Sequence, residues 1–192
     1  MDHHDHVGLI RAAVEGVAGR RWLELGAGEG AFTLALADLL GPHAEIIAID
    51  RDAGALRSLE AEMAPRFPST GLNTIVADFR QALPAGPFDG VLAANSLHFV
   101  GDPVAVMSSA RLALRSGGRL VVVEYDADRG NPWVPHPFSA RRFPELAVDA
   151  GFGTGHEIAR VPSRFLGAIY AAMAEAPPGL LHSRPHGGDR EE

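Results

Sequence analysis

The stretch Glu24-Leu-Gly-Ala-Gly-Glu-Gly30 decides the fold. It follows the apolar Trp22 and Leu23 and precedes an amphipathic run over residues 31–40, which together predict a strand, a glycine turn and the start of a helix. Three alternating glycines let backbone N–H groups approach a ligand where a Cβ would not fit. A helix N-terminus behind them favours polar or anionic groups. We therefore expect a nucleotide-like cofactor at this turn.

Composition describes an ordinary globular domain. The chain has 192 residues, 46% of them apolar and 21% charged, and it contains no cysteine and no lysine. Disulfides, thiolate metal sites, cysteine nucleophiles and lysine Schiff bases are thereby excluded. The net charge of -7 argues against nucleic-acid binding. The start of the chain is acidic and rich in histidine, unlike a signal peptide, and no apolar run could span a bilayer. We expect a cytoplasmic protein without a membrane or metal partner.

Strand and helix patterns alternate along the chain, which predicts an α/β doubly wound, Rossmann-like three-layer sandwich with a mostly parallel sheet. The expected strands are 22–25, 45–50, 74–78, 88–94 and 119–125, and the expected helices are 7–17, 31–40, one capped by Asp52, 103–115 and 139–150. Residues 157–161 and 165–171 are two strands, or a strand and a short helix. Residues 1–173 form a single domain in which 1–18 is an N-terminal cover helix, and 174–192 are expected to be a disordered tail.

The glycine turn alone leaves the cofactor open, because Gly26-x-Gly28-x-x-Ala31 also satisfies the dinucleotide fingerprint and any tight turn can use glycine. Acids at three successive strand ends narrow the choice. Glu24 would repel a pyrophosphate and suit ammonium and sulfonium groups. Asp50 can accept both ribose hydroxyls. Asp78 can accept the adenine amino group while Phe79 covers the base.

With these segments in place, the chain resembles the class I S-adenosylmethionine-dependent methyltransferases of small-molecule type. The matching segments span roughly residues 20 to 125 and are Leu23–Gly30, Ile47–Asp50, Val76–Phe79, Phe88–His98 and Leu114–Leu120. The resemblance implies a seven-stranded sheet closed by one antiparallel edge strand, for which residues 165–171 are the candidate. It also implies S-adenosyl-L-methionine as the cofactor, and it does not name the acceptor.

The resemblance assigns a set of candidate cofactor-binding residues: Glu24, Gly26, Ala27, Gly28, Gly30, Asp50, Arg51, Asp78, Phe79 and Asn95. Asn95 would bond the amino or carboxyl end of the methionine part. His98 and Tyr125 are candidate catalytic residues, His98 either as a general base or as a packed residue that caps its turn. The candidate substrate-binding residues are His98, Tyr125, Arg129, Trp133 and Phe138, and Trp133 either lines an acceptor pocket or fastens its loop to the sheet.

The function that we expect is methyl transfer to a small-molecule acceptor by in-line displacement. One alternative is a non-catalytic S-adenosylmethionine-binding sensor or partner subunit. A less favoured one is an NAD-dependent oxidoreductase, against which Glu24 and the missing Ser…Tyr-x-x-x-Lys set weigh. Whether the chain forms a homodimer is open.

Overall fold

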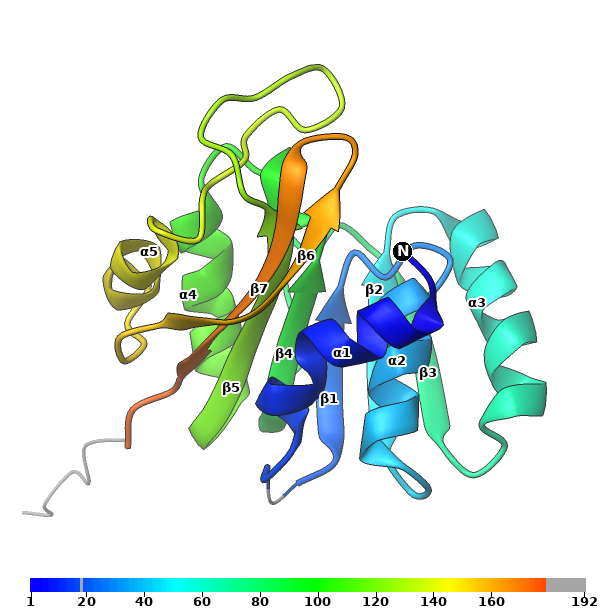
Figure 1. The fold of residues 1–192 in the computed structure, drawn as a ribbon. Helices are drawn as coiled ribbons and strands as arrows, with labels where there is room; N and C mark the ends of the chain where they lie inside the picture. Colours follow the sequence, from blue (N-terminus) through cyan, green and yellow to red (C-terminus); the bar gives the residue numbers. More distant parts are fainter. Residues whose placement is uncertain (18, 179–192) are drawn as a thin grey trace, which may run out of the picture.

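The computed structural model describes residues 1–17 and 19–178, which form one seven-stranded sheet with helices on both faces (Figure 1). The strands are β1 Arg21–Leu25, β2 Glu45–Asp50, β3 Gly71–Val76, β4 Phe88–Ala94, β5 Leu114–Tyr125, β6 His156–Ser163 and β7 Gly167–Glu175. The helices are α1 His3–Val14, α2 Ala31–Leu40, α3 Ala53–Arg66, the 3₁₀ turn η1 Leu97–Phe99, α4 Pro103–Ala113 and α5 Phe143–Asp149. The order β3-β2-β1-β4-β5-β7-β6 confirms the predicted doubly wound fold.

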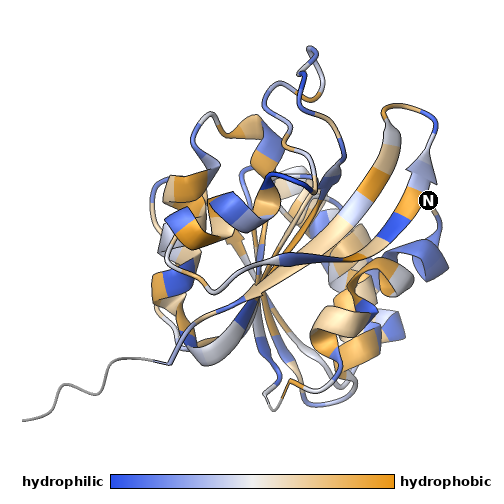
Figure 2. Cartoon of the chain, turned by 60° about the vertical axis from the view of Figure 1, so that its left-hand side comes forward, coloured by the Kyte–Doolittle hydropathy of each residue, from blue (hydrophilic) through white to orange (hydrophobic). Residues whose placement is uncertain are grey.

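Two apolar layers hold the sandwich together, one on each face of the sheet. Alternate side chains of a strand belong to opposite layers, so that Leu23 and Leu25 pack with α4 and α5, whereas Trp22 packs with α1, α2 and α3. Figure 2 shows helices on both sides of the sheet and apolar positions along the central strands. This double burial explains why strands such as β2 read as continuous apolar runs.

Local signals place most helix ends. Asp52 caps α3 by accepting hydrogen bonds from the Gly54 and Ala55 backbone N–H groups, as predicted. The helix α1 starts earlier than predicted because Asp2 and Asp5 form a capping box. It ends at Val14 and packs beside α2 on one face of the sheet. Among the described residues, those of α1 do not line the cofactor pocket described below, so α1 covers the sheet and not that pocket.

The antiparallel part of the sheet lies at the predicted edge but comprises two strands. The strand β7 runs antiparallel to both β5 and β6, and β6 is the outermost strand. The second strand therefore begins at Gly167, lies one place in from the edge, and continues through Ala174 and Glu175, which we had assigned to the tail. Of the rest of the expected tail, residues 176–178 belong to no helix or strand, and residues 179–192 lie outside the described residues.

Further boundaries differ from prediction. The strand β3 runs Gly71–Val76 and not 74–78, so Asp78 lies two residues after its end. The helix α4 ends at Ala113 and β5 begins at Leu114, because Leu114 already pairs with Phe88 ahead of an irregularity in the ladder. The last helix, α5, begins at Phe143 and not at Ser139, with Pro144 in its first turn as expected. Within the described residues, no helix is both long and apolar enough to cross a bilayer.

Candidate cofactor and acceptor site

A pocket of about 510 Å³ opens at the carboxyl ends of β1, β2, β3 and β4. Open α/β sheets bind their ligands at this edge. The residues that line it are Gly26, Gly28, Glu29, Asp50, Arg51, Asp52, Ala55, Ala77, Asp78, Phe79, Arg80, Asn95, Ser96, Phe99 and Val100. Seven of the predicted cofactor residues are therefore brought together in one cavity, and Glu24, Ala27 and Gly30 lie behind its wall.

The three glycines of the turn are required for different reasons: Gly26 and Gly30 avoid clashes with neighbouring side chains, whereas Gly28 faces open space. All have positive φ, +75° at Gly26, +53° at Gly28 and +90° at Gly30. A Cβ on Gly26 would stand 2.6 Å from Ser96 Cβ, and one on Gly30 would stand 2.3 Å from Leu59 Cδ1. A Cβ on Gly28 would meet nothing within 4 Å and would project into open space beside the pocket. Gly28 is thus the position where the backbone is kept bare toward a ligand.

Asp50 fastens the glycine turn from the next strand. Its Oδ2 accepts a hydrogen bond from the Gly28 backbone N–H at 2.8 Å, and its Oδ1 accepts one from the Asp52 N–H at 2.9 Å. The side chain is only partly buried and lines the pocket. Because a carboxylate oxygen can accept more than one hydrogen bond, Asp50 keeps acceptor capacity for a ligand.

Asp78 lines the pocket, and its carboxylate forms an ion pair with Arg80. The Arg80 guanidinium Nε lies 2.9 Å from Oδ1, and Arg80 Nη2 lies 2.5 Å from Oδ2. These bonds, joined by the Arg80 backbone N–H, hold the pKa of the Asp78 carboxyl at about 2. Arg80 was not among the predicted residues, although its position two after Asp78 is visible in the sequence.

The β4 end of the pocket carries polar atoms that lack a partner. Among the described residues, Asn95 Oδ1 and Ser96 Oγ are buried and accept or donate no hydrogen bond, and both residues line the pocket. Asn95 also adopts a left-handed backbone with φ of +50°. Buried polar groups are normally satisfied, so these two atoms have bonding capacity left for a molecule in the pocket.

Glu24 differs from the expected role. Its side chain is 2% exposed, points to the α2 side of the sheet, and accepts a 2.5 Å hydrogen bond from Thr33 Oγ1. Burial raises the pKa of the Glu24 carboxyl to about 8, and the nearby charge of Asp50 adds to the shift. In the ligand-free protein at neutral pH the group is therefore neutral. The repulsion of pyrophosphate that we expected of a charged Glu24 does not operate in this state.

His98 forms a buried pair that the sequence analysis missed. Its Nδ1 lies 2.6 Å from Glu124 Oε2, and its backbone N–H donates to Glu124 Oε1 at 3.1 Å. Both side chains are nearly inaccessible, at 4% and 0% exposure. Glu124 directly follows the apolar run Leu120–Val123 of β5, and an acid within a buried strand was the signal that could have revealed it.

The predicted acceptor residues separate into two groups. The rings of Tyr125 and Trp133 both contact Phe165, at centroid distances of 5.7 and 6.3 Å. Trp133 is 70% exposed, so it does not fasten its loop to the sheet. Phe138 was wrongly placed on the acceptor wall, since it is 2% exposed and packs in the α4–α5 layer. Arg129 is exposed on the same loop as Trp133.

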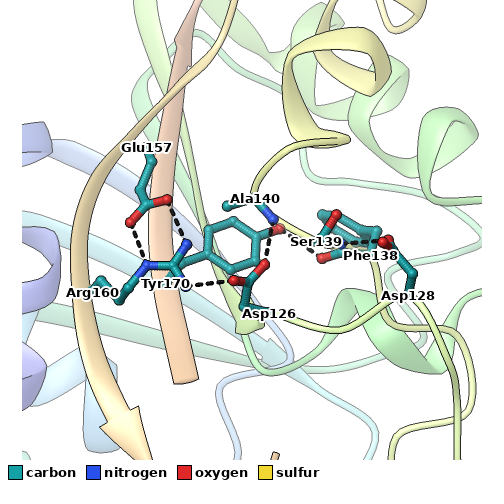
Figure 3. A network of polar contacts seen from close by, with 8 residues as sticks. All are labelled: Asp126, Asp128, Phe138, Ser139, Ala140, Glu157, Arg160 and Tyr170. Atoms are coloured by element: carbon teal, nitrogen blue, oxygen red, sulfur yellow. Dashed lines mark hydrogen bonds and ion pairs between the residues drawn. The ribbon is translucent and has the colours of Figure 1, made fainter. Parts of the chain in front are cut away.

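The loop 126–138 is held in place by a polar network (Figure 3). Asp126 accepts a hydrogen bond from the Ala140 N–H at 3.0 Å and forms an ion pair with Arg160 of β6. Tyr170 of β7 donates its hydroxyl hydrogen to the Phe138 carbonyl at 3.0 Å. Val134 and Phe138, each 2% exposed, are the side chains that anchor the loop in the core. The loop is therefore fixed to the β6–β7 pair while Trp133 is left in solvent.

With this geometry established, the sequence comparisons identify the family. Residues 17–146 match the family model described as "Methyltransferase domain". The chain belongs to the methyltransferase-domain family. It is a class I S-adenosylmethionine-dependent methyltransferase domain, and S-adenosyl-L-methionine is its cofactor. The family and cofactor inferred from the glycine turn and the strand-end acids are thereby confirmed.

Individual relatives share the domain in different settings. A probable cobalt-precorrin-6B C(15)-methyltransferase (decarboxylating) of Thermoplasma volcanium is 29% identical over 83% of this chain and 78% of its own length. A reducing polyketide synthase of a Penicillium species is 29% identical over 93% of this chain, which spans only 8% of that synthase. The solved structure of Burkholderia thailandensis 1,6-didemethyltoxoflavin-N1-methyltransferase, with its substrate and S-adenosylhomocysteine bound, has a TM-score of 0.70 at 18% identity and covers 91% of this chain and 78% of its own.

Proposed function

We propose that this protein transfers the methyl group of S-adenosylmethionine to a small organic acceptor. The observation that carries the proposal is the pocket in which Gly28 is left bare and Asp50 fixes its backbone N–H. In this proposal Asp50 binds the ribose hydroxyls, Asp78 and Phe79 bind the adenine, and Asn95 with Ser96 bind the methionine part. When bound, the cofactor would supply a methyl carbon activated by its sulfonium, and an acceptor nucleophile attacking that carbon in line would displace the neutral thioether.

The pocket fits this cofactor on its own chemistry. An adenosyl group needs acceptors for its hydroxyls and amino group, and Asp50 and Asp78 are carboxylates on two neighbouring walls. The buried Asn95 Oδ1 and Ser96 Oγ, which lack partners among the described residues, suit the polar methionine end. The relatives named for a cobalt-precorrin and for a toxoflavin precursor support a small-molecule acceptor.

We further propose that His98 removes the acceptor proton, with Glu124 as its positioning residue. In this proposal His98 carries its hydrogen on Nδ1 and donates it to Glu124 Oε2, 2.6 Å away, which leaves Nε2 with the lone pair that takes up a proton. A base in this position is required only when the nucleophile keeps its proton. The neighbouring residue, Phe99, lines the cofactor pocket, so the dyad adjoins the pocket at the β4 end. The cytoplasmic location stays a prediction from the sequence.

The test is transfer of radiolabelled methyl from S-adenosylmethionine to a panel of small phenols, arylamines and 1,3-diketones. We expect label in low-mass products and none bound to added protein or RNA. Label found only in macromolecules, or S-adenosylmethionine binding without transfer to any member, would contradict the proposal.

The role of His98 is tested on a phenol that the wild type methylates and on a nitrophenol that is already ionised. We expect His98→Asn and Glu124→Gln to lower the methylation rate of the protonated phenol about 10²–10⁴-fold. The methylation rate of the ionised phenol should fall much less, because it has no proton to remove. S-adenosylhomocysteine affinity should be unchanged. Equal losses with both phenols would show that the pair only supports the fold.

A further inference from the structure

Exposed aromatic side chains gather at one place on the molecule. Among residues 1–17 and 19–178, the exposed Phe, Tyr and Trp side chains are Phe99, Trp133 and Phe165, at 51%, 70% and 50% exposure. They come from η1, the loop 126–138 and the turn between β6 and β7. Large apolar side chains are usually covered, and a cluster of uncovered ones marks a binding surface.

The three exposed rings are connected through two further rings, the partly buried Tyr125 and the buried His98. The centroid of Phe165 lies 6.3 Å from that of Trp133 and 5.7 Å from that of Tyr125. Tyr125 lies 6.1 Å from His98, and His98 lies 4.2 Å from Phe99. We call Phe99, Tyr125, Trp133 and Phe165 the aromatic surface, and His98 is the buried ring that connects Phe99 to Tyr125. The two ring pairs of Phe165, with Tyr125 and with Trp133, meet edge to face at 68° and 81°, whereas the two pairs of His98 are tilted at 49° and 58°, so that no two successive rings lie parallel as in a stack.

The aromatic surface joins the cofactor pocket. Phe99 belongs to both, because it also lines the pocket beside Asn95 and Ser96. At its far end, Trp133 is carried by a loop whose position is fixed by Asp126, Arg160 and Tyr170 (Figure 3). A loop that is already anchored loses less conformational freedom when a ligand binds. The surface is thus both contiguous with the cofactor and largely preformed.

Charge around the surface disfavours a cationic ligand. Asp126 follows Tyr125 directly, but its carboxylate pairs with Arg160, and this pairing and the Ala140 N–H keep its pKa low. Arg129 and Arg164, both exposed, flank Trp133 and Phe165 in the sequence, and the exposed Asp128 is paired with Arg141 at 3.8 Å. A neutral or anionic molecule is therefore better accommodated than an ammonium ion.

We propose that the methyl acceptor is a flat aromatic compound, neutral or anionic, whose ring lies on the aromatic surface with its nucleophilic atom toward Phe99 and His98. This inference rests on the proposed function, because it takes the pocket as the cofactor site. Ring-on-ring contacts favour an aromatic acceptor over a saturated one of the same size by about three- to tenfold in affinity.

The experiment compares 2-naphthol with decahydro-2-naphthol, which has the same carbon skeleton but is not flat. Binding of each to the full chain is measured by saturation-transfer NMR titration with excess S-adenosylhomocysteine present, and trimethylphenylammonium serves as the cationic probe. We expect 2-naphthol to bind about three- to tenfold more tightly than either of the others. Equal or tighter binding of the saturated alcohol or of the cation would overturn the proposal, as would no detectable binding of 2-naphthol.

Variants locate the probe. Trp133→Leu and Phe165→Leu keep an apolar side chain but remove the ring, and both positions are exposed, so the fold should be preserved. We expect each to weaken 2-naphthol binding about threefold or more, whereas Leu112→Ala, at an 86% exposed position on α4, should not. Unchanged binding in both ring variants would overturn the proposal.

Two controls separate the outcomes. The affinity for S-adenosylhomocysteine is measured on the same samples. If S-adenosylhomocysteine does not bind, the proposed function fails; if it binds and 2-naphthol does not, only the proposed class of acceptor fails. Light scattering is run on the wild type and on Trp133→Leu. A wild-type dimer that becomes monomeric in Trp133→Leu would show that a second copy covers the aromatic surface, which would also overturn the proposal.

Discussion

At the scale of single residues, Glu24 shows how burial changes what a carboxyl group contributes. The acid ends a strand beside the glycine turn, yet it bonds Thr33 and its pKa is raised to about 8. In the unfolded chain the same group has an ordinary pKa near 4.5. The folded protein therefore holds a proton that the unfolded chain releases, and the stabilisation present below pH 4.5 is lost as the pH rises toward 8.

This difference predicts the behaviour of Glu24→Gln, which stays neutral and can still accept from Thr33. Between pH 5.5 and 7.5 the free energy of unfolding of the ligand-free wild type should fall relative to that of the variant by about 2–3 kcal/mol. Urea unfolding of both proteins at the two pH values measures it. The matched control is Glu29→Gln, an exposed acid of the same turn, which should follow the wild type. Parallel pH profiles for the wild type and Glu24→Gln would contradict the assignment.

At the scale of elements, the loop 126–138 depends on β6 and β7 for its position. Its contacts are an ion pair from Asp126 to Arg160 and the hydrogen bond from Tyr170 to the Phe138 carbonyl (Figure 3). Arg160 also pairs with Glu157, which lies on its own strand and not in the loop. Removing Glu157 therefore costs Arg160 an ion pair without releasing the loop, whereas removing Asp126 does both.

We predict that Asp126→Ala frees the loop and that Glu157→Ala does not. Asp126→Ala should lower Tm by roughly 2–8 °C, as loss of an ion pair with a backbone hydrogen bond implies. It should also speed trypsin cleavage after the exposed Arg129. Limited proteolysis followed by mass spectrometry, with Glu157→Ala as the control, measures this. Equal cleavage rates in the two variants would mean that the core contacts of Val134 and Phe138 hold the loop unaided.

At the scale of the whole molecule, local sequence patterns were enough to predict the three-layer arrangement of helices and sheet and the residues that gather at the cofactor pocket. The glycine turn, the acid that ends β2, the acid two residues after β3, and the Asp52 cap depend on neighbours in sequence, and they were predictable for that reason. The pairing of His98 with Glu124 joins two strands, and the placement of β7 inside β6 depends on the entire sheet edge. Phe138 was misassigned because an aromatic residue in a loop carries no local sign of burial.

The central claim is that the cavity at the glycine turn binds the adenosyl cofactor. Gly28 is the position that tests this claim. A Cβ there would meet no protein atom within 4 Å, so a branched side chain could be accommodated by the protein but would occupy space beside the pocket that the ligand needs. The most direct measurement is a calorimetric titration of S-adenosylhomocysteine into the wild type and into a Gly28→Val variant shown by circular dichroism to be folded, with NAD as the competitor nucleotide.

The prediction is one site per chain for S-adenosylhomocysteine in the wild type, with affinity for NAD at least about a hundredfold weaker, a difference of about 2.7 kcal/mol. The folded Gly28→Val variant should bind neither ligand measurably. Tight binding of NAD without binding of S-adenosylhomocysteine, or undiminished S-adenosylhomocysteine affinity in the folded variant, would contradict the account.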